Sequence, residues 1–163
     1  MDSKQIYVKV TNEKENHNGF QYIDGLNILQ EPFNNNPNDS CCAGGLYFTT
    51  LEHINKFYEY GINLRVVELP LNDPEFKMIK DRTGDKWRAN KIIFKEKYSL
   101  LDIETYQKFN LNILDNTYFI DNASENGHVN VLDWWKSSGF DLEYSNDAID
   151  YASENGHVNV LDW

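Results

Sequence analysis

Two histidines that lie 29 residues apart are the side chains that most invite a ligand-binding role. His128 and His157 each follow a glycine in the tetrapeptide ENGH. A neutral imidazole is a common metal ligand, but it also serves as a hydrogen-bonding group inside folded proteins. Because each histidine comes directly after a glycine suited to end a helix, we expect both to hydrogen-bond the backbone between repeated units. The pair predicts a structural role, and we expect no metal site.

The two cysteines, Cys41 and Cys42, are adjacent, which is a poor arrangement for a mutual disulfide. Two cysteines in a chain of 163 residues fit a reducing compartment. We expect them to be small, buried or half-buried thiols without a redox or metal-binding role.

Other groups that could carry chemistry are carboxylates and a glycine-containing turn. The segment DRTGDK at 81–86 lacks the spacing of a phosphate-binding loop, and a tight turn explains it. The sequence contains neither HExxH nor Cys-x-x-Cys. Four carboxylates stand in polar surroundings and are expected on a solvated face: Glu13, Glu15, Asp81 and Asp85. We therefore assign no catalytic residue and no cofactor.

The chain carries an internal repeat near its C-terminus. The twelve residues ASENGHVNVLDW stand at 123–134 and again at 152–163. Their pattern predicts a first helix over 119–126 and 148–155, whose apolar stripe is Ile120 and Ala123, then Ile149 and Ala152. Gly127 and Gly156 are expected to end these helices in the left-handed conformation. A second helix begins at His128, buries Val131, Leu132 and Trp135, and ends before Gly139.

The order of helix, glycine turn, helix and polar loop resembles the ankyrin repeat. ENGH matches its turn between the helices, VNVLDWW its apolar second helix and SGFDLEY the stretch that follows. The chain departs from that pattern at DAIDY (147–151), which has neither the usual proline nor the histidine. Its 29-residue period is also shorter than the usual 33, which implies a shortened loop. Shifted back by 29 residues, ETYQKFNLNILDN matches a degenerate earlier unit in which Asn110 replaces the glycine. The resemblance implies a half unit at about 100–117, a unit at 118–146 and a partial unit at 147–163.

Residues 1–99 predict a small α+β domain that is mostly antiparallel, followed over 100–163 by a short all-α ankyrin-like solenoid. Strands are expected at QIYVKVTN, GLYFT, NLRVVELP and ANKIIF, with a hairpin around Asp24–Gly25 and a turn at Gly84–Asp85. Thr50 is expected to cap a helix over 51–60 that Gly61 ends. The aromatic residues of this region are expected in the core: Tyr47, Phe48, Phe57 and Tyr58.

Two resemblances bear on function. CCAGGLYFTT, DRTGDKWRANKI and ASENGHVNVLDWW resemble the ankyrin-repeat proteins of giant amoeba-infecting DNA viruses over nearly the whole chain, which implies a role in the cytoplasm of an infected host. Gly45–Phe48 followed by a helix with Tyr58 is similar to the central block of ADP-ribosyltransferases, with His17-Asn18-Gly19 serving as the early motif. That alternative implies stacking of Tyr58 on nicotinamide, and no late acid or histidine can be assigned to it.

The charge is unevenly distributed. The net charge is −11, and residues 116–163 hold nine carboxylates against Lys136 alone, or −8. A surface this acidic repels phosphate, so nucleic acid and anionic membranes are poor partners. No apolar run approaches the ~20 residues that cross a bilayer, and we see no signal peptide.

We therefore expect a protein–protein interaction scaffold whose partner has a basic surface. The alternative is self-association through the last repeat, where Val158, Leu161 and Trp163 lack a downstream cover. Partner binding is predicted at one tryptophan and at the exposed positions of the loop and following helix: Trp134, Glu143, Tyr144, Asn146, Asp147, Asp150 and Tyr151.

Overall fold

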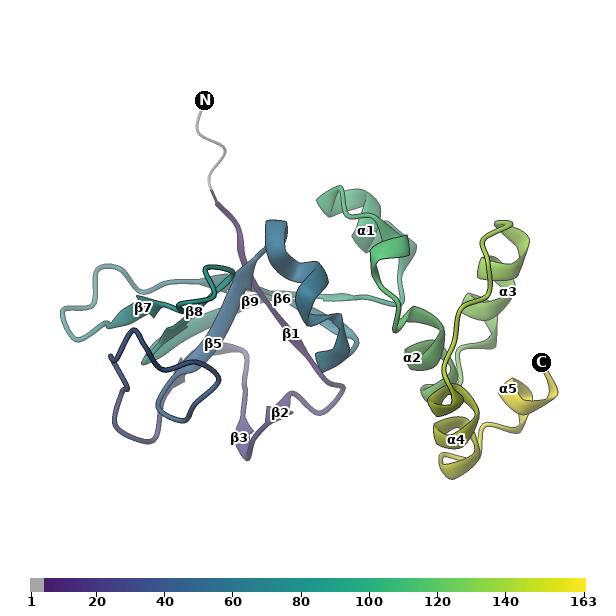
Figure 1. Ribbon diagram of the computed structural model, residues 1–163, viewed down its shortest axis with the longest axis horizontal. Coiled ribbons are helices and arrows are strands. Elements are labelled where there is room, and N and C mark those ends of the chain that lie inside the picture. The colour runs from purple at the N-terminus through teal and green to yellow at the C-terminus, as the bar shows by residue number, and fades with distance from the viewer. Residues whose placement is uncertain (1–4) are drawn as a thin grey trace. The chain divides into compact units, whose positions relative to one another are not determined.

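The computed structural model describes residues 5–163, and the chain divides into two compact units between Tyr98 and Ser99 (Figure 1). The first unit is built on an antiparallel sheet and the second is helical. This confirms the α+β class expected from the sequence, with a sheet domain followed by ankyrin-like helices.

A seven-stranded sheet with the order β4-β9-β6-β1-β5-β8-β7 forms the first unit. Its central strand β1 pairs antiparallel with β6 over five residue pairs, from Tyr7↔Val67 to Thr11↔Asn63. On its other side β1 pairs with β5 over two residue pairs, and β5 continues along β8. The strands are β1 Tyr7–Thr11, β4 Gly25–Ile28, β5 Leu46–Thr50, β6 Asn63–Glu68, β7 Met78–Lys80, β8 Lys86–Ala89 and β9 Lys91–Ser99.

A small separate hairpin joins β2 (Asn16–His17) to β3 (Phe20–Gln21). Its turn is Asn18–Gly19, with φ of 50° and 81°, the two left-handed residues that a two-residue hairpin turn requires. The expected hairpin around Asp24–Gly25 is wrong. Gly25 instead begins β4, which pairs with β9 far along the chain, and the Asn27 side chain holds the bend before β4 by hydrogen bonds with the Ile23 N–H and carbonyl, at 2.9 and 2.8 Å.

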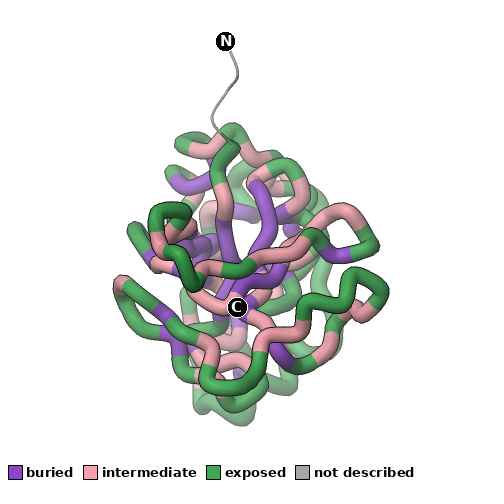
Figure 2. The backbone as a smooth tube through the Cα atoms, turned by 90° about the vertical axis from the view of Figure 1, so that its left-hand side faces the viewer, coloured by how far each residue is buried: buried purple, intermediate pink, exposed green. Residues whose placement is uncertain are grey.

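Aromatic residues form a substantial part of the core of this unit, and Figure 2 colours the buried parts of the backbone purple. Tyr22 stacks on Phe94 with ring centroids 5.1 Å apart, and Phe48 stacks on Trp87 at 6.3 Å. Aromatic pairs of this kind add to the free energy gained from burying their area. The buried cluster contains Tyr22, Leu46, Phe48, Val67, Ala89, Ile92 and Phe94.

The helix predicted over 51–60 is a 3-10 helix, η1 (Leu51–Tyr60), which contacts β1 and β5. Gly61 ends it with φ of 146°, and its N–H donates to the Tyr58 carbonyl. Thr50 occupies the N-cap position with an extended backbone, but the expected side-chain cap is wrong. Its hydroxyl is buried and has no hydrogen-bond partner within the described residues, and the Leu51 N–H at the helix start donates to the Ile6 carbonyl at 3.3 Å.

The second unit consists of short helices: α1 Ile103–Phe109, η2 Ile113–Asp115, α2 Phe119–Glu125, α3 Val129–Ser137, α4 Asn146–Glu154 and α5 Val158–Asp162. The predicted bounds of α2, α3 and α4 are correct to within about two residues. Gly127, Gly156 and Gly139 have φ of 72°, 73° and 75°, the left-handed conformation expected after each helix. Asn110 has φ of 52°, so it replaces glycine after α1 as predicted.

α2 and α4 pack side by side (Figure 1). On α2 the predicted stripe of Ile120 and Ala123 is buried, but on α4 the matching Ile149 is 53% exposed. Ala148 and Ala152 are the buried residues of α4. The side chain of Ile149 lies about 100° round the helix from that of Ala148 and points away from the packed face, because the two alanines bring the helices together.

Candidate functional site

The predicted partner-binding residues occupy the loop before α4, the exposed side of α4 and one position on α3. Trp134 is half-buried and the other six are exposed. We call the set formed by Glu143, Tyr144, Asn146, Asp147, Asp150 and Tyr151, together with Ile149, the repeat surface. Ile149 was missed as a surface residue because the apolar spacing predicted it to be buried.

The repeat surface is held in place by a cap between helices. The Ser145 backbone N–H and hydroxyl donate to the two carboxylate oxygens of Asp121 on α2, at 2.9 and 2.6 Å. The same hydroxyl oxygen accepts from the Asp147 N–H at 3.1 Å and caps α4. The backbone at the loop–helix junction is therefore fixed, although the side chains around it are exposed.

Trp134 lies on α3, whereas the repeat surface belongs to the loop and α4. Its ring contacts Trp135 and Phe140 edge-on, with centroids 6.3 and 6.1 Å apart. Trp135 is buried, and its indole N–H donates to the Asp141 carbonyl at 3.0 Å. Trp134 thus covers the buried Trp135 and keeps part of its own ring accessible.

The helical unit holds most of the net negative charge of the protein. Residues 99–163 contain twelve of the 26 carboxylates and two of the 15 lysines and arginines, for a net charge of −10. The repeat surface combines this charge with exposed apolar groups, since Tyr144, Ile149 and Tyr151 are among the exposed large hydrophobic residues. Exposed apolar side chains rimmed by polar residues are a pattern seen at surfaces that bind another protein.

Within the helical unit, consecutive ankyrin-like repeats are joined by side chains of the duplicated segment. The imidazole of His157 packs against Gly127 of the preceding unit. Asn155 Nδ2 donates to the Glu125 carbonyl at 3.0 Å, and Trp163 Nε1 donates to Asp133 Oδ1 at 2.8 Å. The histidines were expected to hydrogen-bond the backbone between repeat units, but no such bond is present among the described residues: His157 packs its ring on Gly127, and His128 is exposed.

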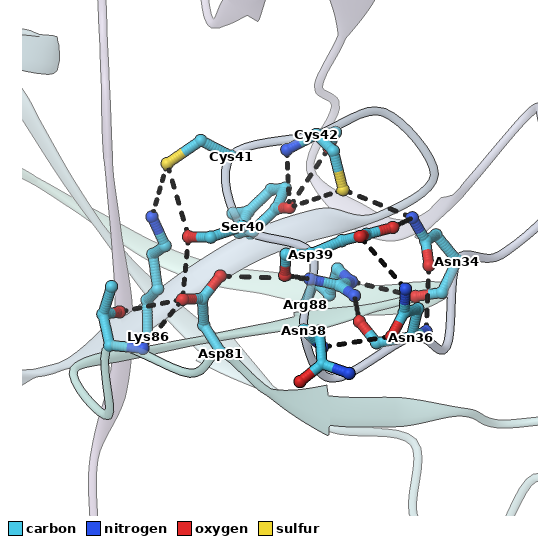
Figure 3. A network of polar contacts seen from close by, with 12 residues as sticks. Asn34, Asn36, Asn38, Asp39, Ser40, Cys41, Cys42, Asp81, Lys86 and Arg88 are labelled. Carbon is cyan, nitrogen blue, oxygen red and sulfur yellow. Dashed lines mark hydrogen bonds and ion pairs between the residues drawn. The ribbon is translucent and has the colours of Figure 1, made fainter.

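In the sheet unit, a polar network fixes the long loop between β4 and β5 (Figure 3). Arg88 on β8 is fully buried, and its guanidinium donates to three loop carbonyls: Asn34 at 2.9 Å, Asn36 at 2.5 Å and Asp39 at 2.8 Å. Asp81 Oδ2 lies 3.9 Å from Arg88 Nη1, and Ser40 Oγ donates to Asp81 Oδ1 at 2.9 Å. One buried cation therefore shapes the loop that carries both cysteines.

Cys41 is exposed, contrary to the buried or half-buried environment expected. Its backbone has φ of 53°, and this left-handed turn directs the thiol outward toward β8. Lys86 Nζ lies 2.8 Å from Cys41 Sγ (Figure 3). The hydrogen bonds from Lys86 and then Ser40 lower the pKa of Cys41 below its ordinary value. Cys42 is half-buried, and its Sγ lies 3.6 Å from the Tyr47 hydroxyl.

Three of the four carboxylates expected on a solvated face are instead bound inside the sheet unit. Glu15 is buried against Arg65, with Nε to Oε2 and Nη2 to Oε1 distances of 2.7 Å. Burial by itself raises the pKa of Glu15, and the hydrogen bonds and charge of Arg65 outweigh it, so that the pKa is lowered. Asp81 is buried, and Asp85 is half-buried with Lys56 Nζ at 3.1 Å. Only Glu13 is exposed.

Among the residues that the resemblance to ADP-ribosyltransferases singles out, His17, Asn18 and Gly45–Phe48 line one cavity, whereas Tyr58 does not. Tyr58 is 2% exposed and belongs to the core beneath η1, so its ring cannot stack on a ligand. His17 lies on β2 with its ring 5.2 Å from that of Tyr60.

Within residues 5–163, no group of three metal-binding side chains is close enough to hold an ion, and none of the helices could span a membrane.

Comparison with known proteins agrees with the helical architecture. The family model for ankyrin repeats (many copies) matches residues 120–163. A protein of Acanthamoeba polyphaga mimivirus that is named as an ankyrin repeat protein is 43% identical over 138 residues, which are 85% of this chain and 64% of the relative. An uncharacterised protein of the same virus is 47% identical over 105 residues, which are 64% of this chain and 75% of the relative.

Another mimivirus protein named as an ankyrin repeat protein is 41% identical over 144 residues, covering 86% of this chain and 43% of the relative. The chain thus spans about half the length of several relatives it matches. No solved structure matches it. The repeat match and the identity over most of the chain confirm the resemblance: the chain belongs to a group of related mimivirus proteins, several of which are named ankyrin repeat proteins, and its residues 120–163 match the ankyrin-repeat model.

Proposed function

We propose that this chain is a protein-interaction scaffold whose repeat surface binds a protein with a basic face. The observation that carries the proposal is the junction of Ser145 with Asp121. That junction fixes the backbone under an exposed set of acidic and aromatic side chains. Repeat proteins bind partners in this way, because packed helices hold the backbone while the exposed side chains determine specificity. The relatives named as ankyrin repeat proteins support the same role.

The chemistry of the surface specifies the class of partner. With a net charge of −10 over residues 99–163, the helical unit attracts lysine- and arginine-rich surfaces and repels phosphate-rich ones. Tyr144, Ile149 and Tyr151 supply the apolar contacts that acidic residues alone cannot provide. Association of this kind speeds up at low salt and weakens as salt screens the charges. A protein with this role acts in the cytoplasm of the infected host and needs no catalytic chemistry.

A crosslinking experiment with matched variants tests the proposal. The full chain, with a photoreactive residue in place of Tyr144, is illuminated in an amoeba extract, and crosslinked proteins are identified and purified. We expect binding of the purified partner to weaken at least tenfold in the variant D147K/D150K, and to weaken as salt rises from about 50 to 500 mM. The control E104K/D115K makes the same charge change at two exposed side chains away from the repeat surface. Equal losses in both variants, or binding that salt leaves unchanged, would contradict the proposal.

Exposed apolar residues on α5 support a second candidate, association between copies of the chain. Val158, Leu161 and Trp163 are exposed on or just after that helix. Sedimentation over a concentration series would show a dimer that V158S/L161S dissociates. A monomer at every concentration excludes this candidate and leaves the first one unaffected.

A further inference from the structure

The central sheet opens between two of its strands. β1 and β5 are paired at Tyr7↔Thr50 and Val8↔Thr49, and the pairing stops there, although β1 continues to pair with β6 as far as Thr11. Beyond Val8 the ladder between β1 and β5 ends, while β5 goes on pairing with β8 as far as Leu46. Lys9 lies at the point of separation, and its Nζ donates to the Tyr47 carbonyl of β5 at 2.7 Å.

A cavity of about 430 Å³ occupies this opening. That volume falls within the range of small-molecule sites, roughly 300–1,000 Å³. Its walls come from β1, β5, the β2–β3 hairpin, the end of η1 and the loop that carries Cys41 and Cys42. Six aromatic side chains line it: Phe20, Tyr22, Tyr47, Phe48, Phe57 and Tyr60. A lining this rich in rings suits a planar, apolar molecule.

Lys9 places a positive charge at the inner wall of the cavity. It is 8% exposed, and its ammonium lies 5.0 Å from the centre of the Tyr22 ring. Among the described residues, no carboxylate forms an ion pair with it. Burial lowers the pKa of Lys9 to about 8, and burial together with the nearby Lys9 charge lowers the pKa of His17. Buried charges in proteins are normally paired, so an unpaired ammonium that lines a cavity indicates a place for an anion.

The other charged groups that line the cavity already have partners. Lys86 is hydrogen-bonded to Cys41 Sγ, and the Glu31 carboxylate accepts from the Gly44 N–H at 3.0 Å. Lys9 is therefore the lining cation best placed to bind a negative group inside the cavity. Its two ammonium hydrogens beyond the one given to Tyr47 can both donate to such a group.

We propose that this cavity binds a small aromatic carboxylate, with its carboxylate on Lys9 and its ring among the aromatic side chains. The site lies in the sheet unit and is independent of the repeat surface. A ligand of this class would give the N-terminal unit a recognition function separate from partner binding by the helices. Either proposal can fail without the other.

The test uses 1-naphthoate and its uncharged analogue 1-naphthalenemethanol with the full chain. Isothermal titration calorimetry measures affinity, and amide chemical shifts locate the site. We expect naphthoate to bind at least about tenfold more tightly, since a charge-assisted hydrogen bond distinguishes the two compounds. The shifted amides should belong to β1, β5 and the β2–β3 hairpin. Lys9→Met should remove this preference, and Lys77→Met, which changes an exposed lysine outside the cavity, should retain it.

A second variant separates loss of charge from loss of fold. Lys9→Gln keeps a donor for the Tyr47 carbonyl but carries no charge, so it should fold and still lose the preference for naphthoate. The melting temperature of each variant is measured alongside binding. Equal affinity for the two compounds, full binding by Lys9→Gln, or no binding of naphthoate up to millimolar concentration would overturn the proposal.

Discussion

The imidazole of His157 packs directly on Gly127, so that a Cβ added to this glycine would lie 2.6 Å from His157 Nδ1. Gly156 occupies the same place in the second copy of ENGH with nearly the same φ, and nothing lies within 4 Å of its added Cβ. The two glycines thus share one backbone conformation and differ in the contact between units. A comparison of the two positions isolates the contribution of repeat stacking.

We predict that Gly156→Ala lowers the free energy of unfolding by about 1 kcal/mol, the cost of a left-handed alanine. Gly127→Ala should lower it by about 2–3 kcal/mol, because the His157 ring must also be displaced. Urea unfolding followed by tryptophan fluorescence measures both changes, since three of the four tryptophans lie in the helical unit. The loss caused by Gly127→Ala beyond that caused by Gly156→Ala should largely disappear in the double variant Gly127→Ala/His157→Ala. Equal losses at the two glycines would show that stacking does not depend on this contact.

Cys41 should react with iodoacetamide faster than an ordinary cysteine at pH 7. Lys86 Nζ, 2.8 Å from its Sγ, stabilises the thiolate, which is the nucleophile. Because the pKa of Cys41 is lowered, its alkylation rate should level off at a lower pH than that of a free thiol. Lys86→Met should shift this profile to higher pH, whereas Lys80→Met on the neighbouring strand should leave it unchanged. Peptide mass mapping over a pH series distinguishes Cys41 from Cys42.

The buried pair of Glu15 and Arg65 should contribute to stability at neutral pH. Glu15→Gln should lower the free energy of unfolding at pH 7 by about 3 kcal/mol, since it leaves a buried guanidinium with one exposed acidic partner, Asp24. The lowered pKa of Glu15 means that its carboxylate stabilises the fold above the unfolded pKa of about 4.3, and that this stabilisation is lost as pH falls further. The difference in free energy of unfolding between wild type and Glu15→Gln should therefore become smaller below pH 4. Glu13→Gln is the exposed control, and a gap that does not depend on pH would contradict the assignment.

Local rules predicted the helical unit well because each of its signals lies within a few residues. The rule that glycine follows a short apolar helix correctly predicted the left-handed conformation of Gly127, Gly139 and Gly156. The 29-residue shift correctly predicted α1 and the role of Asn110 at its end. Local rules failed at Ile149, where packing through two alanines overrode apolar spacing. The choice of packed face depends on the neighbouring helix, which a helical period does not specify.

The sheet unit was harder to predict because its polar residues act over long sequence separations. Glu15 and Arg65 are 50 residues apart, and Arg88 binds loop carbonyls 49–54 residues before it. Nothing near Glu15 in sequence distinguishes it from the exposed Glu13. The opening beside Lys9 depends on where the pairing of β1 with β5 stops, which is a matter of register. Regular alternation places Lys9 on the face opposite Val8 and Val10, where solvent is expected, so nothing in the sequence indicates that this lysine is buried.

Lys9 should make the fold less stable than it could be at neutral pH. Its pKa is about 8 in the folded chain and about 10.5 when unfolded, so the unfolded state holds the proton more tightly. Wild-type stability should therefore rise as pH increases from 8 to 10.5. Lys9→Met lacks this dependence and should be more stable at pH 7 by about 2 kcal/mol, after loss of the bond to the Tyr47 carbonyl.

Urea unfolding of both proteins at pH 7 and pH 10 measures the difference, with Lys77→Met as the exposed control. The advantage of Lys9→Met should shrink at pH 10, because the folded wild type then carries a neutral amine. A variant less stable than wild type at pH 7 would mean that the fold itself compensates the Lys9 charge. A variant that is more stable implies that the cation is retained at a cost in stability, as expected when a buried charge serves to bind a ligand.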